Sequence, residues 1–431
     1  MKILVVGSGG REHAIVRKLK ESPQVEAVLC APGNGGISRD AACFPVNAMD
    51  REGMLALAQE QQVDLVFVAP DDPLAAGMVD FLEAAGIPCF GPNAAAAQIE
   101  ASKVFSKDLM KKYGIPTAGY EVFADPAAAL EYIKAQGKYP AVIKADGLAL
   151  GKGVVIAQDE EEAKAALHSI MEDKIFGESG AHVVVEEFLT GPEVSVLAFT
   201  DGKAMCPMVS SMDHKRAYDG DKGPNTGGMG TISPNPFYTQ EVAQQCMERI
   251  FLPTMAAMNA EGRPFKGCLY FGLMLTPDGP KVIEYNCRFG DPETQVVLPL
   301  LQSDLLKIML ATTNGTLDQT DVVFSDGAAA CVVLASGGYP LSYEKGKPIT
   351  GLENGQLPGG EATVYHAGTA IKDGVLVTAG GRVLGVTATA PTLPEALKKA
   401  YAASDSIHFE KLHKRSDIGA RALAALQKER D

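Results

Sequence analysis

The sequence predicts an α/β protein in three parts: a doubly wound N-terminal domain, a central domain of mixed strands and helices, and a small β-rich C-terminal domain. Apolar runs alternate with helical segments up to about residue 100, glycine-rich turns separate strands and helices in the middle, and short β-rich segments follow from about residue 328. The length of 431 residues fits about three domains of ordinary size.

The first hundred residues alternate strand and helix. The apolar strand-like runs lie at 3–6, 27–29, 65–68 and 89–90, and the helical segments at 11–20, 51–61 and 74–85. Strands of this type pair in parallel, with the helices packed on both faces of the sheet. The loops at their carboxyl ends, 7–12, 31–36 and 69–72, are therefore expected to line one crevice.

The rest of the chain has a mixed and then a β-rich pattern. The central helices are expected at 103–113, 160–171 and 239–259, and the central strands up to Lys144 and at 154–157, 183–187, 268–275 and 281–286. The C-terminal strands are expected at 328–335, 362–367, 375–378 and 383–388, before a helix at 394–404.

Composition and charge exclude several classes of protein. The net charge of −14, with no block of basic residues, argues against a nucleic-acid or membrane partner. The first apolar run is too short for a signal or a membrane segment, so we expect a cytoplasmic protein. The eight cysteines include no C-x-x-C pair, which favours reduced, buried thiols over a zinc site.

The first glycine cluster, residues 7–13, follows a strand and opens a helix, so its backbone N–H groups are available to an anion. It departs from the dinucleotide fingerprint, because Glu12 occupies the third glycine position and no acid is placed for a ribose. The cluster favours a small phosphorylated substrate. A nicotinamide cofactor and a purely structural turn are the alternatives.

The second glycine cluster, residues 142–154, is a strand, a turn and a strand, with Lys144 and Lys152 on its two sides. Only three residues separate Gly147 from Gly151, so the spacing is not that of a P-loop. A mobile turn of this kind can close over a triphosphate, because glycines allow close backbone approach. An ordinary hairpin with solvated lysines is the alternative.

An E-x-N pair in the strand at 281–286 predicts a metal site. Glu284 and Asn286 project to the same face, because side chains alternate along a strand. Magnesium prefers such oxygen ligands and completes its coordination with water and phosphate. Arg288 follows, with planar donors suited to a carboxylate or a phosphate. A solvated strand edge is the alternative for the pair alone.

Two further segments are less specific. The strand at 183–187 ends in acids before a Gly-Pro turn, and can offer backbone groups to an adenine edge and a carboxylate to a ribose. The polar, glycine-rich segment 213–230 is too long for a plain linker, and such segments often act as lids or binding loops. It contains His214, for which a structural role is more common than a general base.

Taken in order, these stretches resemble the ATP-grasp ligases, and among them the ligases that join glycine to 5-phosphoribosylamine. The resemblance runs nearly the whole chain, and its most specific parts are DHKR with GPNTGGMG in 213–230 and NCRFGDPETQ in 286–295. The other matching stretches are GGREHA (9–14), APGNGG (31–36), FGP (90–92), SKVFSKD (102–108), IKADGLALGKGV (143–154), VEEFLTGPEVS (185–195) and HAGT (366–369).

The resemblance implies a central ATP-grasp fold of two α+β lobes. It implies domains at 1–101, 102–325 and 326–431, with a mobile lid lobe at about 118–192. ATP, with Mg²⁺ or Mn²⁺, is expected to activate glycine as glycyl phosphate, which the amine of 5-phosphoribosylamine attacks to give glycinamide ribonucleotide in purine biosynthesis. We expect a monomer, with a dimer as the alternative.

The resemblance also implies site residues, position by position. Those expected to contact ATP are Lys103, Lys107, Lys144, Gly147, Gly151, Lys152, Gly153, Glu186, Glu187, Phe188, Leu189 and Glu193, and those expected to bind the metal are Glu284 and Asn286. Those expected on the phosphoribosylamine and glycine side are Gly9, Gly10, Arg11, Glu12, Asn34, Asp213, His214, Lys215, Arg216, Asn225, Thr226, Gly227, Gly228, Met229 and Arg288. The expected catalytic residues are Arg288, Lys144 and Asp213.

Two departures from the family pattern affect these expectations. Ala69-Pro70-Asp71 stands where the family commonly has Gly-Pro-Glu, and the strand at 268–275 lacks the metal-binding acid that many ATP-grasp enzymes place there. The alternative functions are a related carboxylase that uses bicarbonate, a nicotinamide-dependent oxidoreductase and a non-catalytic binding protein.

Overall fold

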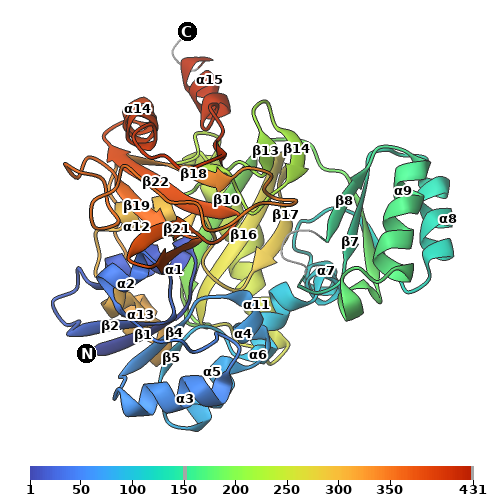
Figure 1. Cartoon of the computed structure of the whole chain (residues 1–431). Coiled ribbons are helices and arrows are strands. Elements are labelled where there is room, and N and C mark those ends of the chain that lie inside the picture. The colour runs from blue at the N-terminus through green and yellow to red at the C-terminus, as the bar shows by residue number, and fades with distance from the viewer. Residues whose placement is uncertain (149–152, 429–431) are drawn as a thin grey trace.

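The computed structural model describes residues 1–148 and 153–428, and Figure 1 shows their arrangement. The N-terminal domain is a five-stranded parallel sheet in the order β3-β2-β1-β4-β5, with helices on both faces, which confirms the doubly wound prediction. Its strands are β1 (Lys2–Gly7), β2 (Ala27–Pro32), β3 (Ala42–Cys43), β4 (Leu65–Val68) and β5 (Cys89–Phe90). Its helices are α1 (Gly10–Leu19), α2 (Ile37–Asp40), α3 (Arg51–Glu60), α4 (Asp71–Ala75), α5 (Met78–Ala84) and α6 (Ala94–Ala101).

The expectation of one helix at 74–85 is wrong. The chain forms α4 and α5 instead, and Gly77 lies between them with φ of +84°. That left-handed conformation, which glycine adopts without steric cost, ends one helix and allows the next to start in a new direction. A purely apolar periodicity does not reveal such a break.

The central domain has two lobes. One lobe, here named the lid lobe after the role expected for it, projects on the right of Figure 1 and contains an antiparallel sheet in the order β6-β9-β7-β8, covered by two helices. Its elements are β6 (Tyr120–Phe123), α8 (Pro126–Gln136), β7 (Ala141–Ala145), β8 (Val154–Ala157), α9 (Glu160–Leu167) and β9 (Val183–Glu187). Residues such as Ile133, Ile143 and Val183 form a hydrophobic core that belongs to this lobe alone.

The second lobe contains an antiparallel sheet in the order β11-β10-β16-β17. Its strands are β10 (Glu193–Thr200), β11 (Met205–Pro207), β16 (Gly267–Thr276) and β17 (Gly279–Asn286). The helices packed around it are α7 (Lys103–Tyr113), α10 (Gln240–Cys246), α11 (Leu252–Ala260) and α13 (Leu305–Asn314), whereas α12 (Thr294–Leu300) packs against α1 and the C-terminal sheet.

The C-terminal sheet is antiparallel, in the order β12-β15-β18-β22-β19, with β23 paired to β18. Its strands are β12 (Met212–Asp213), β15 (Gly230–Ser233), β18 (Ala328–Ser336), β19 (Thr363–His366), β22 (Arg382–Ala390) and β23 (Leu412–His413). Two hairpins, β13 (Arg216–Tyr218) with β14 (Lys222–Asn225) and β20 (Thr369–Lys372) with β21 (Val375–Thr378), and the helices α14 (Leu393–Ser404) and α15 (Ala420–Lys428) complete the domain. The two ends of the segment 213–230, Asp213 and Gly230, therefore belong to a sheet that the sequence assigned to the C-terminal domain.

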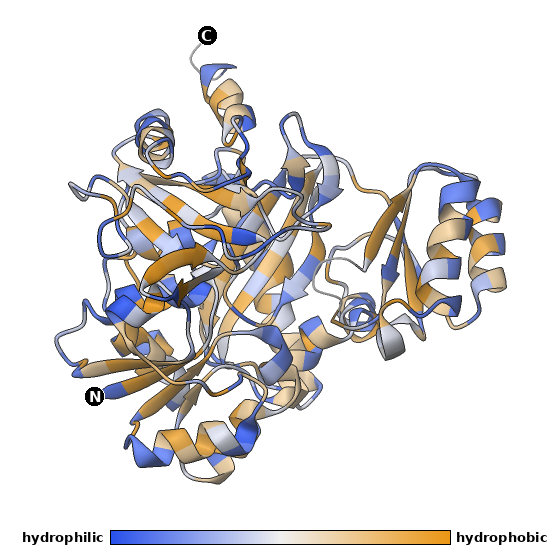
Figure 2. Ribbon diagram, in the orientation of Figure 1, coloured by the Kyte–Doolittle hydropathy of each residue, from blue (hydrophilic) through white to orange (hydrophobic). Residues whose placement is uncertain are grey.

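Apolar residues concentrate on the strands and on the inward faces of the helices, as Figure 2 shows. The buried side chains form four cores. Two are shared by the N-terminal and central sheets, and one of these also reaches β18; the third lies at the C-terminal sheet and the fourth in the lid lobe. Within residues 1–148 and 153–428, none of the helices combines the length and the apolarity needed to span a membrane.

Candidate active site

A cavity of about 960 Å³ lies where the N-terminal, central and C-terminal domains meet. Its volume suits a nucleotide and small substrates. The site residues predicted from the sequence that line it are Arg11, Lys103, Lys107, Lys144, Gly147, Gly153, Glu186, Glu187, Phe188, Leu189, Glu193, Asp213, His214, Lys215, Arg216, Asn225, Thr226, Gly227, Glu284, Asn286 and Arg288.

Three buried charges meet where the sheet of the lid lobe faces α7. Nζ of Lys107, on α7, lies 3.1 Å from one carboxylate oxygen of Glu186, and Nζ of Lys144, on β7, lies 3.0 Å from the other. The antiparallel pairing of Val142 with Glu186 puts the Lys144 and Glu186 side chains on one face of the sheet. Burial lowers the pKa of Lys107 to about 8, although Glu186 opposes the shift. The Glu186 side chain is thus the counter-ion of two lysines.

A third lysine, Lys103 of α7, contacts the start of the glycine turn. Lys103 Nζ donates a hydrogen bond of 2.7 Å to the carbonyl oxygen of Gly147, and burial lowers the pKa of Lys103. Gly147 has φ of +96°, and a Cβ there would lie 2.5 Å from Ser179 Oγ, so only glycine fits. Gly151 and Lys152, which were predicted to contact ATP, lie outside the described residues.

The predicted metal ligands share one face of β17. Glu284 and Asn286 are partly buried and line the cavity, whereas the hydroxyl of Tyr285 lies in the core, 2.9 Å from Thr254 Oγ1. No cluster of three or more His, Cys, Asp and Glu side chains suited to a metal occurs in the described part of the chain. A metal held here would therefore take two protein oxygens and complete its shell with phosphate and water, as magnesium commonly does.

Arg288 is held by acids of the N-terminal domain. Its Nη2 lies 2.9 Å from Glu100 Oε1 and 3.8 Å from Asp71 Oδ2, and Glu100 Oε2 also accepts a hydrogen bond of 2.7 Å from the Cys287 backbone N–H. Burial raises the pKa of Glu100, and the Arg288 charge opposes this shift. Sequence reasoning missed Glu100, because it lies in an alanine-rich helix outside every motif.

Other cavity residues were also missed. Tyr270 lines the cavity and donates a hydrogen bond of 3.1 Å to Glu293, near the predicted pair in which Lys215 Nζ lies 2.8 Å from Asp213 Oδ2. Arg382 Nη1 donates to the carbonyl oxygens of Gly227 (2.9 Å) and Asp291 (2.8 Å). Asp291 and Glu293 lie within the NCRFGDPETQ stretch, which could have pointed to them, whereas Arg382 carries no sequence signal.

Six predicted substrate residues do not line the cavity. They are Gly9, Gly10, Glu12, Asn34, Gly228 and Met229. Glu12 accepts a hydrogen bond from the Gly9 backbone and pairs with Arg11 Nε at 2.7 Å, so it fixes the position of that arginine. The Asn34 amide donates to the carbonyl oxygens of Ser8 (2.8 Å) and His366 (2.7 Å).

The expectation of one crevice lined by three loops is therefore only partly right. The loops after β1 and β4, the strands between which the strand order reverses, contribute Arg11 and Asp71 to the cavity. The loop at 31–36 instead packs against the C-terminal domain, where the Gly35 backbone donates to Thr369.

His214 has the surroundings of a structural residue. Its Nε2 accepts a hydrogen bond of 3.0 Å from the Gly419 backbone, and its Nδ1 lies 3.0 Å from the carbonyl oxygen of Gly230. Burial lowers the pKa of His214 to about 4, so the ring is neutral at pH 7.

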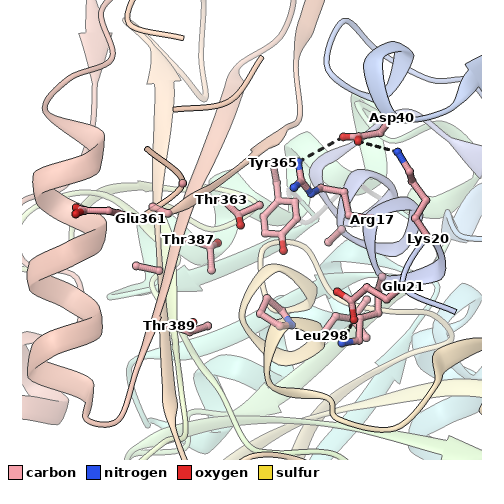
Figure 3. A pocket seen from close by; sticks show the side chains of 16 residues that line it. Arg17, Lys20, Glu21, Asp40, Leu298, Glu361, Thr363, Tyr365, Thr387 and Thr389 are labelled. Carbon is pink, nitrogen blue, oxygen red and sulfur yellow. Dashed lines mark hydrogen bonds and ion pairs between the residues drawn. The ribbon is translucent and has the colours of Figure 1, made fainter. Parts of the chain in front are cut away.

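A second cavity of about 430 Å³ lies between α1 and the C-terminal sheet (Figure 3). Its cations already have partners: Arg17 and Lys20 lie 3.5 and 3.1 Å from Asp40, and Lys18 lies 2.6 Å from Glu21. Its charges are mutually compensated, which gives no reason to place the chemistry there.

Comparison with known proteins places the chain in a family. The N, ATP-grasp (A) and C domains of phosphoribosylglycinamide synthetase match residues 1–100, 101–294 and 329–421. The phosphoribosylamine–glycine ligases of Agrobacterium fabrum and Caldanaerobacter subterraneus are 49% and 48% identical, over 98% and 97% of this chain and 99% and 100% of their own lengths. A trifunctional purine biosynthetic protein of Gallus gallus is 49% identical, and the match covers all of this chain but 43% of that protein.

Comparison with solved structures supports the same family. The crystal structure of phosphoribosylamine–glycine ligase from Thermotoga maritima matches with a TM-score of 0.83 and 38% identity, over 97% of this chain and 100% of that one. A biotin carboxylase domain from Hydrogenobacter thermophilus has a TM-score of 0.74 at 18% identity, over 96% of this chain and 91% of that one, and shows the fold alone. Domain order, identity over the full length and fold together establish that the chain belongs to the phosphoribosylglycinamide synthetase family of ATP-grasp ligases.

Proposed function

We propose that the cavity between the three domains is where this ligase joins glycine to 5-phosphoribosylamine, using ATP and a divalent metal. One observation carries the proposal: groups from distant parts of the chain, Lys107, Lys144 and Glu284, line the same cavity. Lys144 Nζ also donates a hydrogen bond of 3.1 Å to the carbonyl oxygen of Ile283, directly before Glu284. Lys107 of α7, Lys144 of the lid lobe and the oxygens of β17 are therefore within reach of one metal-bound triphosphate.

The lysines and the strand oxygens divide the work on the nucleotide. Lys107 and Lys144 neutralise phosphate charge and orient the γ-phosphoryl group, which is most of what phosphoryl transfer requires of a protein. Glu284 and Asn286 have the hard oxygens that Mg²⁺ or Mn²⁺ prefers, and would hold it. A metal bound by these two residues would supply further neutralisation of the phosphate charge.

Arg288, which is paired with Glu100 and Asp71, is suited to bind the carboxylate of glycine. Arg288 keeps a buried Nε that has no hydrogen-bond partner among the described residues, so it has a donor left for an anion. We assign it to the glycine carboxylate, whose oxygen attacks the γ-phosphorus to give glycyl phosphate and ADP. The amine of 5-phosphoribosylamine then attacks the acyl carbon and expels phosphate.

Three further cations of the cavity suit the phosphorylated amine. Lys215, Arg382 and Arg11 line it, and each is positioned by a neighbouring acid. The lid lobe has its own core, so it can move as a unit and exclude water from the acyl phosphate.

Omitting each substrate in turn tests the proposal. Glycinamide ribonucleotide and ADP should form together only when glycine and 5-phosphoribosylamine are both present, and bicarbonate should not replace glycine. ADP formation that depends on bicarbonate would refute this assignment in favour of a carboxylase. Light scattering would test the expected monomer, and fractionation of cells the expected cytoplasmic location.

A further inference from the structure

The segment 213–226, here named the substrate loop, has little apolar packing of its own. Its residues 213–216, 221 and 225–226 line the cavity, yet residues 218–223 are exposed, and Ala217 is its one fully buried apolar side chain in this part of the structure. A loop with so few apolar contacts needs another source of order. Residues 412–421, here named the C-terminal brace, provide it.

Arg415 is the centre of the brace. Its side chain is only 1% exposed. Nη1 lies 3.0 Å from Asp221 Oδ1 and donates a hydrogen bond of 3.1 Å to the carbonyl oxygen of Arg216, so it holds strand β13 and the turn that leads to β14. Nε and Nη2 form a fork with Asp417, at 2.8 and 2.9 Å. Such bidentate, charge-assisted bonds fix geometry as well as adding stability.

The neighbours of Arg415 continue the same contact. Asp417 Oδ2 also accepts a hydrogen bond of 2.8 Å from the Gly220 backbone, and the Ser416 backbone donates one of 2.8 Å to Asp219. At the two ends of the contact, His413 Nε2 donates to Ala217 O (2.7 Å), and the Gly419 backbone donates to His214 (3.0 Å). The brace thus contacts the substrate loop at intervals from 214 to 221.

We propose that Arg415 is a positioning residue for ligation: the C-terminal brace holds the substrate loop in its binding conformation before any substrate arrives. The inference rests on the proposed function in one respect, the assignment of this loop to 5-phosphoribosylamine. It changes the role of the segment from a moving cover to a preformed wall. A preformed wall raises affinity, because the ordering cost is met during folding and not during binding.

Three variants test this. Arg415→Met removes the two bonds to Asp417 and the contacts with the β13–β14 hairpin. Arg415→Lys keeps the positive charge but not the bidentate geometry. Asp219→Asn weakens the hydrogen bond from Ser416 on the side of the substrate loop. Lys414→Met is the matched control, because that neighbouring cation contacts Ser404 and Asp405 of its own domain and not the loop. Amide hydrogen exchange across 214–226, the affinity for an ATP analogue, and the KM values for both substrates are measured in each.

Amide exchange in the loop should rise in Arg415→Met, less in Arg415→Lys, and not in Lys414→Met. If one loop in ten molecules stays competent, KM for 5-phosphoribosylamine rises about 10-fold, since apparent affinity scales with the competent fraction. KM for ATP should stay within twofold, roughly the scatter of such a measurement. If Arg415→Met fails to fold, Asp219→Asn provides the test: it should also raise amide exchange in the substrate loop and KM for 5-phosphoribosylamine.

Unchanged amide exchange in Arg415→Met and Asp219→Asn would overturn the claim that the C-terminal brace orders the substrate loop. Raised exchange with an unchanged KM for 5-phosphoribosylamine would overturn the positioning role. The proposed function is tested separately with the unmodified protein. If that protein makes no glycinamide ribonucleotide, the substrate assignment is refuted, and amide exchange still decides whether the C-terminal brace orders the substrate loop.

Discussion

Replacing Glu186 with glutamine removes the carboxylate that lies 3.1 Å from Lys107 and 3.0 Å from Lys144. All three side chains are 3–5% exposed, so the two ammonium groups would be left in a poorly solvated place without a counter-ion. Breaking a buried ion pair by removing one partner costs about 3–5 kcal/mol. The variant tests whether Glu186 neutralises the two lysines in the absence of nucleotide, as phosphate would when the nucleotide is bound.

Deprotonation of Lys107 should limit the loss of stability in Glu186→Gln. Its pKa is about 8, so at pH 7 it can release its proton for about 1.4 kcal/mol, which is one pKa unit. We therefore expect the lower end of the range, a loss of about 3 kcal/mol in the free energy of opening of β7 and β9. An ATP analogue with Mg²⁺ should reduce the difference between the variant and the parent, because phosphate charge replaces the lost carboxylate.

Native-state amide exchange of β7 and β9 measures this free energy directly. Glu187→Gln is the matched control, since that neighbouring carboxylate is exposed on the same strand and should change stability by less than about 0.5 kcal/mol. Equal protection of Glu186→Gln and its parent without nucleotide would refute the counter-ion role. A loss that persists unchanged with the analogue would refute phosphate binding by the two lysines.

The remaining predictions concern three other groups. Glu284→Ala should abolish ligation and leave thermal unfolding unchanged, because it removes a metal ligand and no core contact; near-normal turnover would contradict the metal assignment. ATP affinity, measured by calorimetry from pH 7 to about 9.5, should fall as the pH rises through about 8, because Lys107 then loses its charge, and Lys107→Arg should flatten the fall. Glu100→Gln should lower kcat about 10- to 100-fold, the equivalent of about 1.5–3 kcal/mol for a hydrogen bond between charged groups, with KM for ATP little changed; steady-state kinetics showing a rise in KM for ATP alone would contradict a role through Arg288.

Local sequence patterns predicted most of the fold. The strand at 183–187 was predicted with its observed bounds, and the strand at 281–286 extends only two residues further at its start, to Gly279. These segments have continuous apolar character or strict alternation, and neighbouring turns mark their ends. The break at Gly77 was missed, because a glycine inside an apolar helical pattern is compatible with either one helix or two.

The candidate site was predictable where residues lie within motifs and not where tertiary structure brings them in. Lys144, Glu284 and Arg288 lie in stretches whose spacing already suggested phosphate and metal chemistry, and they line the cavity. Glu100 and Arg382 reach it from a different helix and a different sheet, and nothing in their neighbours along the chain indicates this. The segment 213–230 was expected to act as a lid or a binding loop, and the pairing of its end with the C-terminal sheet was not predicted, because strands that pair with residues a hundred positions away leave no local periodicity.

The interlacing of β12 and β15 with the C-terminal sheet limits how the chain can be divided. β15 lies between β12 and β18, with four of its residues paired to β18. A fragment ending at residue 325 would retain the lysines and the strand oxygens, but it would expose the buried flank of β15 as an open edge. Such edges recruit other chains. Truncation at this point should therefore yield aggregates and not a smaller nucleotide-binding module, so the cut that looks natural along the sequence runs through a single folding unit.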